Sequence, residues 1–465
     1  MPELQPPLSC PAIPAPPLLL GLAGFGTVGA ALAAILEKNK AEILSRTGRE
    51  IRIKSILTRD PAKPRACPIP LGAHLTTQAD DLLLDPEINV LVELIGGADT
   101  AGELIRRALE SGKNVVTANK ALLAERGNAI FSLAAERNLH LGYEAAVCGA
   151  IPIIRTLRAS LAGNHIESLI GILNGTCNFI LSEMSERNLD FAQALREAQR
   201  LGYAEADPEL DIEGLDAAHK LSLLIRLAWG LEYPYTDMPV QGIAGVAPRD
   251  IRNAREFGYR IKLIGYARLG AGESAETGGM EAGVCPALVH ENFLLSRVEG
   301  PYNAVRVEGN ACGSLFLHGK GAGGPPTASS VLADILDIAR GDNPNNTGFP
   351  LRRQLLPAHP LPDDRCFSPW YIRLTVRDCP GVLRDVSGIL ADNDISIAEV
   401  TQKEDAASPP AAEQGLLDCI PLLIMTHSSS VAGVQKALRA LENSSFVQEP
   451  PVHYRVLGRS NVGTS

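Results

Sequence analysis

Apolar runs and amphipathic stretches alternate along the chain up to about Tyr143. An apolar run at 18–29 contains a glycine turn and leads into an alanine- and leucine-rich segment that reaches about Lys40. Unbroken Val, Ile and Leu runs are typical of parallel strands buried on both faces. These runs and the predicted helices between them indicate a doubly wound α/β domain over 18–149. Further strands are expected at 51–57, 88–96 and 114–120.

The pattern changes after about Ala150, where helical stretches mix with segments of strand character. This mixture predicts an α+β domain over 150–324. A glycine cluster at 319–324 precedes a predicted helix at 325–340, which we expect to complete the first domain. The predicted helices are 191–200 and 214–230, and the strand-like segments are 165–173, 259–269 and 303–309.

Residues 341–369 are rich in Pro, Asn, Asp and Gly, which predicts a linker. The segment 370–457 then has the order βαββαβ of a ferredoxin-like module. If few core contacts cross the linker, a chain cut near Pro360 should keep its fold.

Length, charge and cysteine content narrow the class of protein. The 465 residues favour about three domains. A net charge of −10 disfavours a nucleic-acid binder, and the longest apolar runs are too short to cross a membrane. Nine cysteines without a ligand cluster argue against zinc and for a reduced, cytoplasmic protein. The proline-rich arm 1–17 has no basic region, so we do not expect a signal peptide.

One glycine-rich turn has the pattern that binds dinucleotides. The GxGxxG sequence follows a predicted buried strand and opens a helix, so backbone N–H groups could approach a pyrophosphate. A turn without ligand is the plainer interpretation, but the context favours binding. The residues concerned are Gly24, Phe25, Gly26, Thr27, Val28 and Gly29.

Two later strand ends carry further candidates for cofactor binding. Arg59 follows the second strand where no acidic residue stands to bind a ribose hydroxyl, which favours the 2′-phosphate of NADPH over NADH. Thr117 and Lys120 end the fourth strand, at the sheet edge where ligands bind in such folds. A solvated surface charge remains the alternative for both Arg59 and Lys120.

The densest polar stretch runs from Gly202 to Lys220 and contains six carboxylates within twelve residues, Glu205 and Asp211 among them. A calcium loop fails in every register because the required glycine or glutamate is missing. Asp216 and Lys220 lie four residues apart on a predicted helix and therefore share a face. Without other evidence, they could equally form a minor surface salt bridge.

Cys177 is a possible nucleophile, but a thiolate needs a basic partner that the sequence does not place. A buried, inert cysteine is the commoner state.

These segments together resemble homoserine dehydrogenases that carry a C-terminal ACT domain. The resemblance is carried by GLAGFGTVG, VTANK, GILNGTCNFIL, GYAEADPELDIEGLDAAHK, GKGAGGPPTAS and VRDCPGVL, and it spans roughly 18–345 and 370–457. It implies interconversion of L-homoserine and L-aspartate 4-semialdehyde with NAD(P), in threonine, isoleucine and methionine biosynthesis.

The resemblance also implies roles for particular residues. Lys220 would donate a proton to the aldehyde oxygen, and Lys120 would be a second lysine of the active site. Glu205, Asp211 and Asp216 would bind the substrate. Thr27, Val28 and Arg59 would bind NADPH, with Gly202 and Gly323 close to it. A monovalent cation, for which Na⁺ is expected, would be bound by Glu144, Val147, Gly149 and Ile151.

The ACT segment implies feedback inhibition by L-threonine and a homodimer or homotetramer. We place the effector near the turn from Asp378 to Gly381, where a predicted helix N-terminus offers free N–H groups. A module that only assists oligomerisation is the alternative. Two other functions stay open: a phosphorylating semialdehyde dehydrogenase that uses Cys177, and a non-catalytic amino-acid sensor.

Overall fold

A computed structural model of the chain describes residues 15–65, 67–342, 344, 346–349, 355–402 and 419–458. Most of the proline-rich arm, parts of the predicted linker and the segment 404–415 lie outside these residues. The chain forms two compact units, Met1–Ser160 with Ala322–Gln354, and Leu161–Gly321 with Leu355–Ser465. Within the described residues, no helix combines the length and apolarity needed to cross a bilayer.

The first unit is built on a six-stranded parallel sheet in the order β3-β2-β1-β4-β5-β6, which confirms the predicted doubly wound fold. Its strands are β1 (Ala15–Ala23), β2 (Arg49–Leu57), β3 (His74–Thr76), β4 (Val90–Glu93), β5 (Asn114–Thr117) and β6 (Leu141–Gly142). Its longer helices are α1 (Thr27–Lys38), α2 (Lys40–Thr47), α4 (Asp99–Glu110), α5 (Lys120–Glu136) and α12 (Gly324–Arg340), and its short ones are α3 (Asp80–Leu83) and α6 (Ile153–Arg155).

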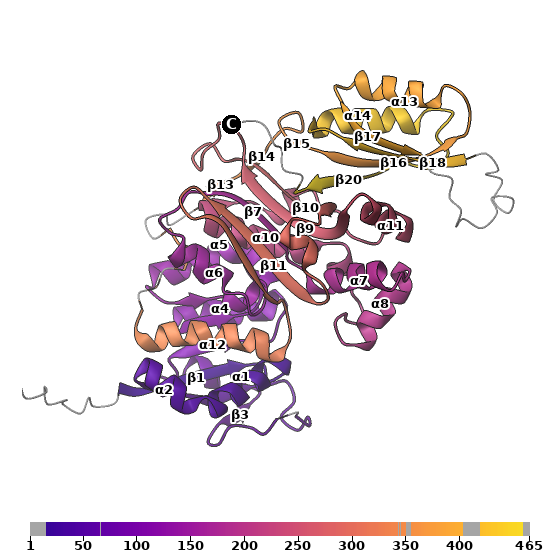
Figure 1. Ribbon diagram of the computed structural model, residues 1–465. Helices are drawn as coiled ribbons and strands as arrows, with labels where there is room; N and C mark the ends of the chain where they lie inside the picture. Colours follow the sequence, from indigo (N-terminus) through magenta and orange to yellow (C-terminus); the bar gives the residue numbers. More distant parts are fainter. Residues whose placement is uncertain are drawn as a thin grey trace, which may run out of the picture. The chain divides into compact units, whose positions relative to one another are not determined.

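Helix α12 reaches this unit from a distant part of the sequence, and Figure 1 shows it beside the N-terminal strands and helices. Its apolar face, with Val331 and Ile335, packs into the same core as Leu20 of β1 and Leu32 of α1. Burial of such side chains contributes about 1.5–3 kcal/mol each, which explains how a helix so late in the sequence stays attached to this sheet.

The second unit contains a long mixed sheet in the order β12-β11-β7-β9-β10-β20-β16-β18-β17. The strands of its first half are β7 (Ile166–Ile172), β9 (Tyr259–Leu269), β10 (Gly279–His290), β11 (Tyr302–Gly309) and β12 (Gly313–Lys320). The helices around them are α7 (Gly175–Glu186), α8 (Phe191–Arg200), α9 (Glu209–Ile212), α10 (Leu215–Trp229) and α11 (Pro248–Glu256). The predicted α+β mixture is confirmed, although β10 and β12 were not predicted.

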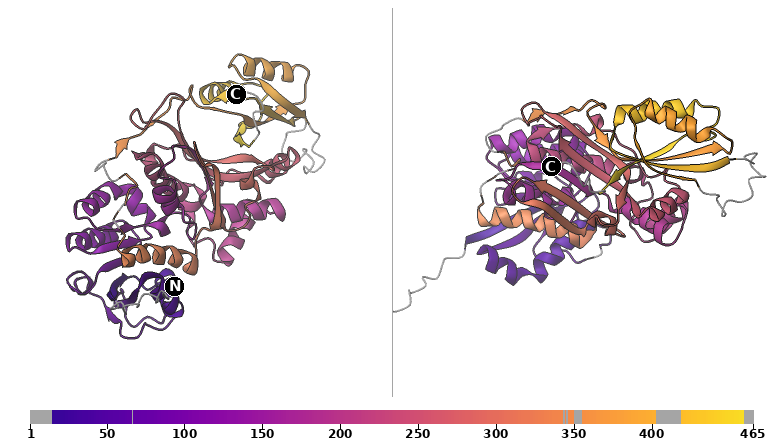
Figure 2. Two further views of the ribbon diagram at one scale, coloured as in Figure 1. Left: turned by 60° about the vertical axis from the view of Figure 1, so that its left-hand side comes forward. Right: turned by 45° about the horizontal axis from the view of Figure 1, so that its top comes forward.

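The second half of this sheet is the predicted βαββαβ module. It consists of β16 (Trp370–Arg377), α13 (Val382–Ala391), β17 (Ile397–Gln402), β18 (Cys419–Thr426), α14 (Val431–Glu442) and β20 (Val452–Leu457). Figures 1 and 2 show both helices on one face of its strands, where Val386 and Leu441 join Ile424 in an apolar core.

The module is joined to the rest of the second unit by more contacts than the sequence suggested. Strand β20 pairs in parallel with β10, at Ala287 with Arg455 and Val289 with Leu457. Arg373 of β16 donates from Nε to Asp250 of α11 at 2.6 Å, and both side chains are buried. The condition for a cut near Pro360 to leave the fold intact, that few core contacts cross, is therefore not met, and removing the module would uncover an edge of β10 and a buried carboxylate.

Candidate active site

The glycine turn after β1 has the local geometry of a dinucleotide-binding loop. Gly24 has a φ of +101°, and a Cβ there would lie 2.7 Å from the Leu94 carbonyl oxygen. A Cβ on Gly29 would lie 2.3 Å from the Gly24 carbonyl oxygen, so this glycine lets α1 pack against the strand. A Cβ on Gly26 would meet nothing within 4 Å. The turn thus leaves open space beside Gly26 at the start of α1, as a dinucleotide-binding loop requires.

The start of α12 lies against this turn. A Cβ on Gly324 would lie 3.0 Å from the Thr27 carbonyl oxygen, a tight contact, so the absence of a side chain eases this approach. Gly323 precedes the helix with a φ of +118°, and Pro325 and Pro326 follow in its first turn. Because proline has no N–H, this helix end offers few donors, and its main contribution to a binding site is close approach.

The carboxyl ends of β4 and β5 hold a buried polar cluster. The Thr117 hydroxyl donates to Glu93 Oε2 at 2.6 Å, and Glu93 Oε1 accepts the N–H of Ile95 at 2.8 Å. The Asn119 side chain caps α5, whose first residue is the half-buried Lys120. The Thr117 hydroxyl is therefore used inside the fold, whereas Lys120 stands at the sheet edge where ligands bind in parallel sheets.

Two arginines follow β2. Arg59 is exposed, as expected for a residue that would meet a cofactor phosphate or solvent. Arg65, which the sequence analysis did not single out, donates from Nη2 to Thr58 Oγ1 at 3.2 Å. Its guanidinium also lies 6.0 Å from the centre of the Phe25 ring. The positively charged Arg65 side chain is thus held beside the glycine turn. Its spacing from Arg59 gives no periodic signal, so the sequence pattern does not mark it.

In the second unit, Lys220 and Asp216 form a buried ion pair on α10. Lys220 Nζ lies 2.7 Å from Asp216 Oδ2, and the two residues are 7% and 4% exposed. The surface salt bridge that the sequence left open is therefore excluded. Burying such a pair is costly unless further hydrogen bonds complete it.

The hydrogen bonds around this pair come from residues that the sequence analysis did not name. Asn174 donates from Nδ2 to both Asp211 and Asp216 at 2.7 Å, and thereby brings two carboxylates of the acidic stretch together. The Leu173 carbonyl accepts from Lys220 Nζ at 2.8 Å and from Asn303 Nδ2 at 2.9 Å. Asn303 is fully buried, and Lys220 is thus held in a fixed direction.

The start of the acidic stretch lies apart from this network. Glu205 is exposed, and its carbonyl oxygen accepts a hydrogen bond from Gln199 Nε2 at 3.2 Å. Gly202 has a φ of +76° just after α8, where a left-handed residue ends a helix. Among the predicted substrate residues, Asp211 and Asp216 therefore stand with Lys220.

Cys177 is a poor nucleophile in this setting. Its side chain is fully buried, and Sγ donates to the Asp211 carbonyl oxygen at 3.0 Å. Burial, together with the charges of Asp211 and Asp216, raises the pKa of the Cys177 thiol well above its ordinary value. The thiol is therefore protonated near neutral pH, which argues against the phosphorylating dehydrogenase.

The four predicted cation ligands lie in one turn-rich segment of the first unit. Glu144 is buried, and its two carboxylate oxygens accept the N–H groups of Ile154 and Arg155 at 2.8 Å. The Gly149 carbonyl accepts from Ser330 Oγ at 2.7 Å, and Val147 and Ile151 flank it. Among the described residues, no cluster of three His, Cys, Asp or Glu side chains could hold a metal ion, so a cation here would depend on backbone carbonyls.

The turn predicted to bind an effector borders a cavity. Gly381 precedes α13 with a φ of +101°, and no N-cap side chain accepts a hydrogen bond from the start of this helix. The cavity has a volume of about 380 Å³, and Arg377, Asp378, Gly381, Gln402 and Leu422 are among the residues that line it.

The fold and these sites define a nicotinamide-dependent oxidoreductase with a C-terminal ferredoxin-like module. Family models match over residues 24–144 (homoserine dehydrogenase, NAD binding domain), 152–336 (homoserine dehydrogenase) and 370–444 (ACT domain). The chain belongs to the homoserine dehydrogenase family.

Individual relatives agree with this assignment. A homoserine dehydrogenase of Pseudomonas aeruginosa is 43% identical over 446 residues, which covers 95% of this chain and 99% of that protein. The one of Neisseria gonorrhoeae is 42% identical and covers 93% of this chain and 97% of its own. The crystal structure of a homoserine dehydrogenase from Thiobacillus denitrificans is similar with a TM-score of 0.85 and 41% identity, and covers 95% of this chain and 98% of its own.

Proposed function

We propose that Lys220 donates the proton to the carbonyl oxygen when L-aspartate 4-semialdehyde is reduced to L-homoserine. The observation that carries this proposal is the burial of the Lys220 ammonium against Asp216 and the Leu173 carbonyl oxygen. A proton donor held in a fixed direction can stabilise negative charge as it develops on the reacting oxygen. When bound, the nicotinamide cofactor supplies the hydride.

The carboxylates beside Lys220 would bind the α-ammonium group of the substrate. Asp211 is brought to the site by Asn174, and Asp216 already neutralises Lys220. We also assign Glu205 to the substrate, although its exposed side chain lies apart from the Lys220 network, and we assign Lys120 to the cofactor and substrate. Charge pairing of this kind needs no metal, which suits an amino-acid substrate.

Replacement of Lys220 by alanine tests this assignment. We expect kcat to fall by at least about 10²-fold, because general acid catalysis contributes about 10²–10⁴-fold. The dissociation constant for the coenzyme should not change. Lys436→Ala, an exposed lysine on α14, is the control and should keep full activity. Near-normal turnover in Lys220→Ala, with the fold checked by circular dichroism, would contradict the proposal.

For the coenzyme, we propose NADPH, with Arg59 and Arg65 on its 2′-phosphate; NADH would bind more weakly. The glycine turn and Thr27, Val28 and Gly323 would cradle the pyrophosphate. Thr117 would shape the site from within, and Gly202 is assigned to coenzyme binding by the family resemblance. In support, an archaeal homoserine dehydrogenase, 29% identical over 70% of this chain and 99% of its own with a TM-score of 0.59, was solved in complex with NADPH.

Arg59→Ala should then raise KM for NADP⁺ by about 10–150-fold, the cost of losing a charge-assisted contact of about 1.5–3 kcal/mol. KM for NAD⁺ should hardly change. Arg65→Ala should act in the same direction, and Arg46→Ala, an exposed arginine on α2, serves as control. Initial rates of homoserine oxidation with each coenzyme provide the measurement. Equal effects on NADP⁺ and NAD⁺ would show that these arginines do not bind the 2′-phosphate.

We further propose that Glu144 and the carbonyls of Val147, Gly149 and Ile151 bind a monovalent cation such as Na⁺. The set is oxygen only, which fits a hard cation. For the module we propose that L-threonine binds at the turn from Asp378 to Gly381 and inhibits the enzyme, and that the protein is a cytoplasmic homodimer or homotetramer. Activity with and without Na⁺ and L-threonine, and the mass in solution by light scattering, test these proposals.

A further inference from the structure

Asn303 is a buried asparagine of β11 whose side chain forms one side of the Lys220 site. Its Nδ2 donates to the Leu173 carbonyl oxygen at 2.9 Å, and the same oxygen accepts from Lys220 Nζ at 2.8 Å. A carbonyl oxygen has two lone pairs, and these two donors occupy both. The direction from which Lys220 reaches Leu173 is therefore set in part by Asn303.

The hydrogen bond from Asn303 also holds the end of β7, from which another partner of this site comes. Leu173 follows the last residue of β7, and next to it Asn174 donates from Nδ2 to Asp216 Oδ2 at 2.7 Å. That carboxylate oxygen lies 2.7 Å from Lys220 Nζ. A shift of the segment Leu173–Asn174 would therefore disturb both the carbonyl and the counterion that hold Lys220.

The other polar atom of the Asn303 amide has no evident structural use. Asn303 is fully buried, and among the described residues its Oδ1 has no hydrogen-bond partner. A buried amide oxygen without a partner loses its hydration and gains no hydrogen bond in return. Rotation of the amide by half a turn would not help, because Oδ1 would then face the Leu173 carbonyl oxygen.

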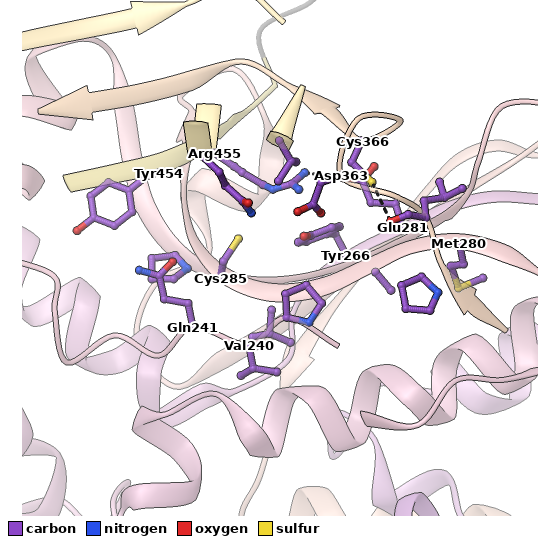
Figure 3. A pocket seen from close by; sticks show the side chains of 18 of the residues that line it. Val240, Gln241, Tyr266, Met280, Glu281, Cys285, Asp363, Cys366, Tyr454 and Arg455 are labelled. Atoms are coloured by element: carbon purple, nitrogen blue, oxygen red, sulfur yellow. Dashed lines mark hydrogen bonds and ion pairs between the residues drawn. The ribbon is translucent and has the colours of Figure 1, made fainter. Parts of the chain in front are cut away.

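A second buried acceptor of the same unit shows complete pairing. Glu281 lies on the wall of a cavity of about 320 Å³ between β10 and the module (Figure 3). It is 5% exposed, and each of its carboxylate oxygens accepts from a guanidinium, from Arg455 at 2.6 Å and from Arg268 at 2.8 Å. Asn303 is buried more deeply, yet one of its polar atoms is unmatched. Stability alone therefore does not explain an asparagine at this position.

The surrounding backbone keeps the Asn303 amide in place. A Cβ on Gly321 would lie 2.2 Å from its Oδ1 and 2.5 Å from its Nδ2, and a Cβ on Gly175 would lie 3.3 Å from Oδ1. The segment before Asn303 is fixed as well, because Asn178 Nδ2 donates to three carbonyl oxygens of residues 298–302. The amide therefore presents its N–H group to Leu173 from a rigid setting.

We propose that Asn303 is a positioning residue for proton transfer, which fixes the Leu173 carbonyl so that Lys220 Nζ is directed at the reacting oxygen. This inference rests on the proton-donor role proposed above for Lys220. The polar atoms of Asn303 are buried against backbone, so it acts through Lys220 and not on the substrate. Displacement of a reacting group by about 1 Å can cost about 10²-fold in rate, which makes such an anchor effective.

Initial rates of homoserine oxidation and chemical denaturation of the full chain test this inference. Asn303→Leu replaces the amide by an apolar group of similar shape. It should lower kcat by about 10–100-fold, and no more than Lys220→Ala does. KM for L-homoserine and the dissociation constant for the coenzyme should hardly change. Because the substitution also removes the unpartnered oxygen, the free energy of unfolding should not fall.

The decisive variant is the double substitution Lys220→Ala/Asn303→Leu. If Asn303 acts through Lys220, the second substitution lowers kcat no further, whereas independent effects would multiply. Asn164→Leu is the matched control, because Asn164 Oδ1 accepts the N–H of Cys312 at 2.9 Å in the turn between β11 and β12. Its loss removes an amide hydrogen bond away from Lys220 and should leave kcat unchanged.

The inference is wrong if Asn303→Leu keeps kcat, changes KM alone, or lowers kcat by the same factor with and without Lys220. A like loss of kcat in Asn164→Leu would also overturn it. Asn303→Ala is the second variant if leucine disturbs the packing, and failure of both to fold would assign Asn303 to the fold alone. If Lys220→Ala itself keeps near-normal turnover, the proton-donor proposal fails, and the role of Asn303 fails with it.

Discussion

The candidate sites of the two units are built in different ways. In the first unit, the glycine turn after β1 depends on the absence of side chains. Gly24 and Gly29 have no room for a Cβ, and Gly26 leaves open space. In the second, Lys220 and Asp216 work through side-chain charge that is taken out of water. The first site depends on backbone shape, whereas the second depends on a balance of charges.

This difference determines how each site should fail. A substitution at the glycine turn adds atoms to a crowded backbone, so its cost is steric and depends on which glycine is changed. A substitution at the ion pair leaves a partner charge buried without compensation, which is among the most destabilising single changes in proteins.

The largest effect is expected for Asp216→Leu. It leaves the Lys220 ammonium buried without its counterion and should lower the free energy of unfolding by about 3–5 kcal/mol. The double variant Asp216→Leu/Lys220→Met removes both charges and should recover much of this loss, while activity stays abolished. Chemical denaturation and a standard activity assay measure both quantities. If the double variant is no more stable than the single one, the pair is not the source of the cost.

A smaller effect, of about 1–3 kcal/mol, is expected for Gly29→Ala, because the added Cβ would come within 2.3 Å of the Gly24 carbonyl oxygen. Gly26→Ala is the matched control for the fold. It should unfold at nearly the same temperature as the unaltered protein, but it should bind the coenzyme more weakly because the methyl group occupies the open space. A comparable loss of Tm in both variants would show that space at the turn does not distinguish these glycines.

The smallest effect is expected from thiol alkylation. Because burial raises the pKa of Cys177, its thiol remains protonated at pH 7, and iodoacetamide should not inactivate the native enzyme. As pH rises toward the raised pKa, the thiolate fraction grows, so any inactivation should appear only at strongly alkaline pH. Exposed Cys312 is the control and should be labelled under the same conditions, as detected by mass spectrometry. Rapid inactivation at pH 7 would revive the hypothesis of a cysteine nucleophile.

Much of the fold could be predicted because its signals are local. Apolar runs predicted β1, β4 and β5, and alternating apolar residues marked β2. The strand at Tyr259–Leu269 was predicted with the bounds that it has. The four-residue spacing of Asp216 and Lys220 predicted a shared face, which the 2.7 Å contact confirms. Strand β10 was missed because its sequence, GMEAGVCPALVH, contains two glycines and a proline that disfavour a strand prediction.

The rest of the site depends on contacts between distant segments. Asn174, Leu173 and Asn303 meet around Lys220 although Asn303 lies far from the others in the sequence, and no periodicity marks them. Burial excludes a surface salt bridge for Asp216 and Lys220, and burial cannot be read from spacing. The pairing of β20 with β10 was hidden for the same reason, since strand partners across a long connection carry no local signature.

The parallel pairing of β10 with β20 also has a consequence for folding during synthesis. β10 is synthesised well before the module, and the edge that will receive β20 has no strand partner at Ala287–Val289 until the module emerges. An open strand edge is a template for pairing with other chains. Slow or interrupted translation after β10 should therefore favour pairing of this edge with other chains. The edge is covered only when β20 has been synthesised and has paired with β10.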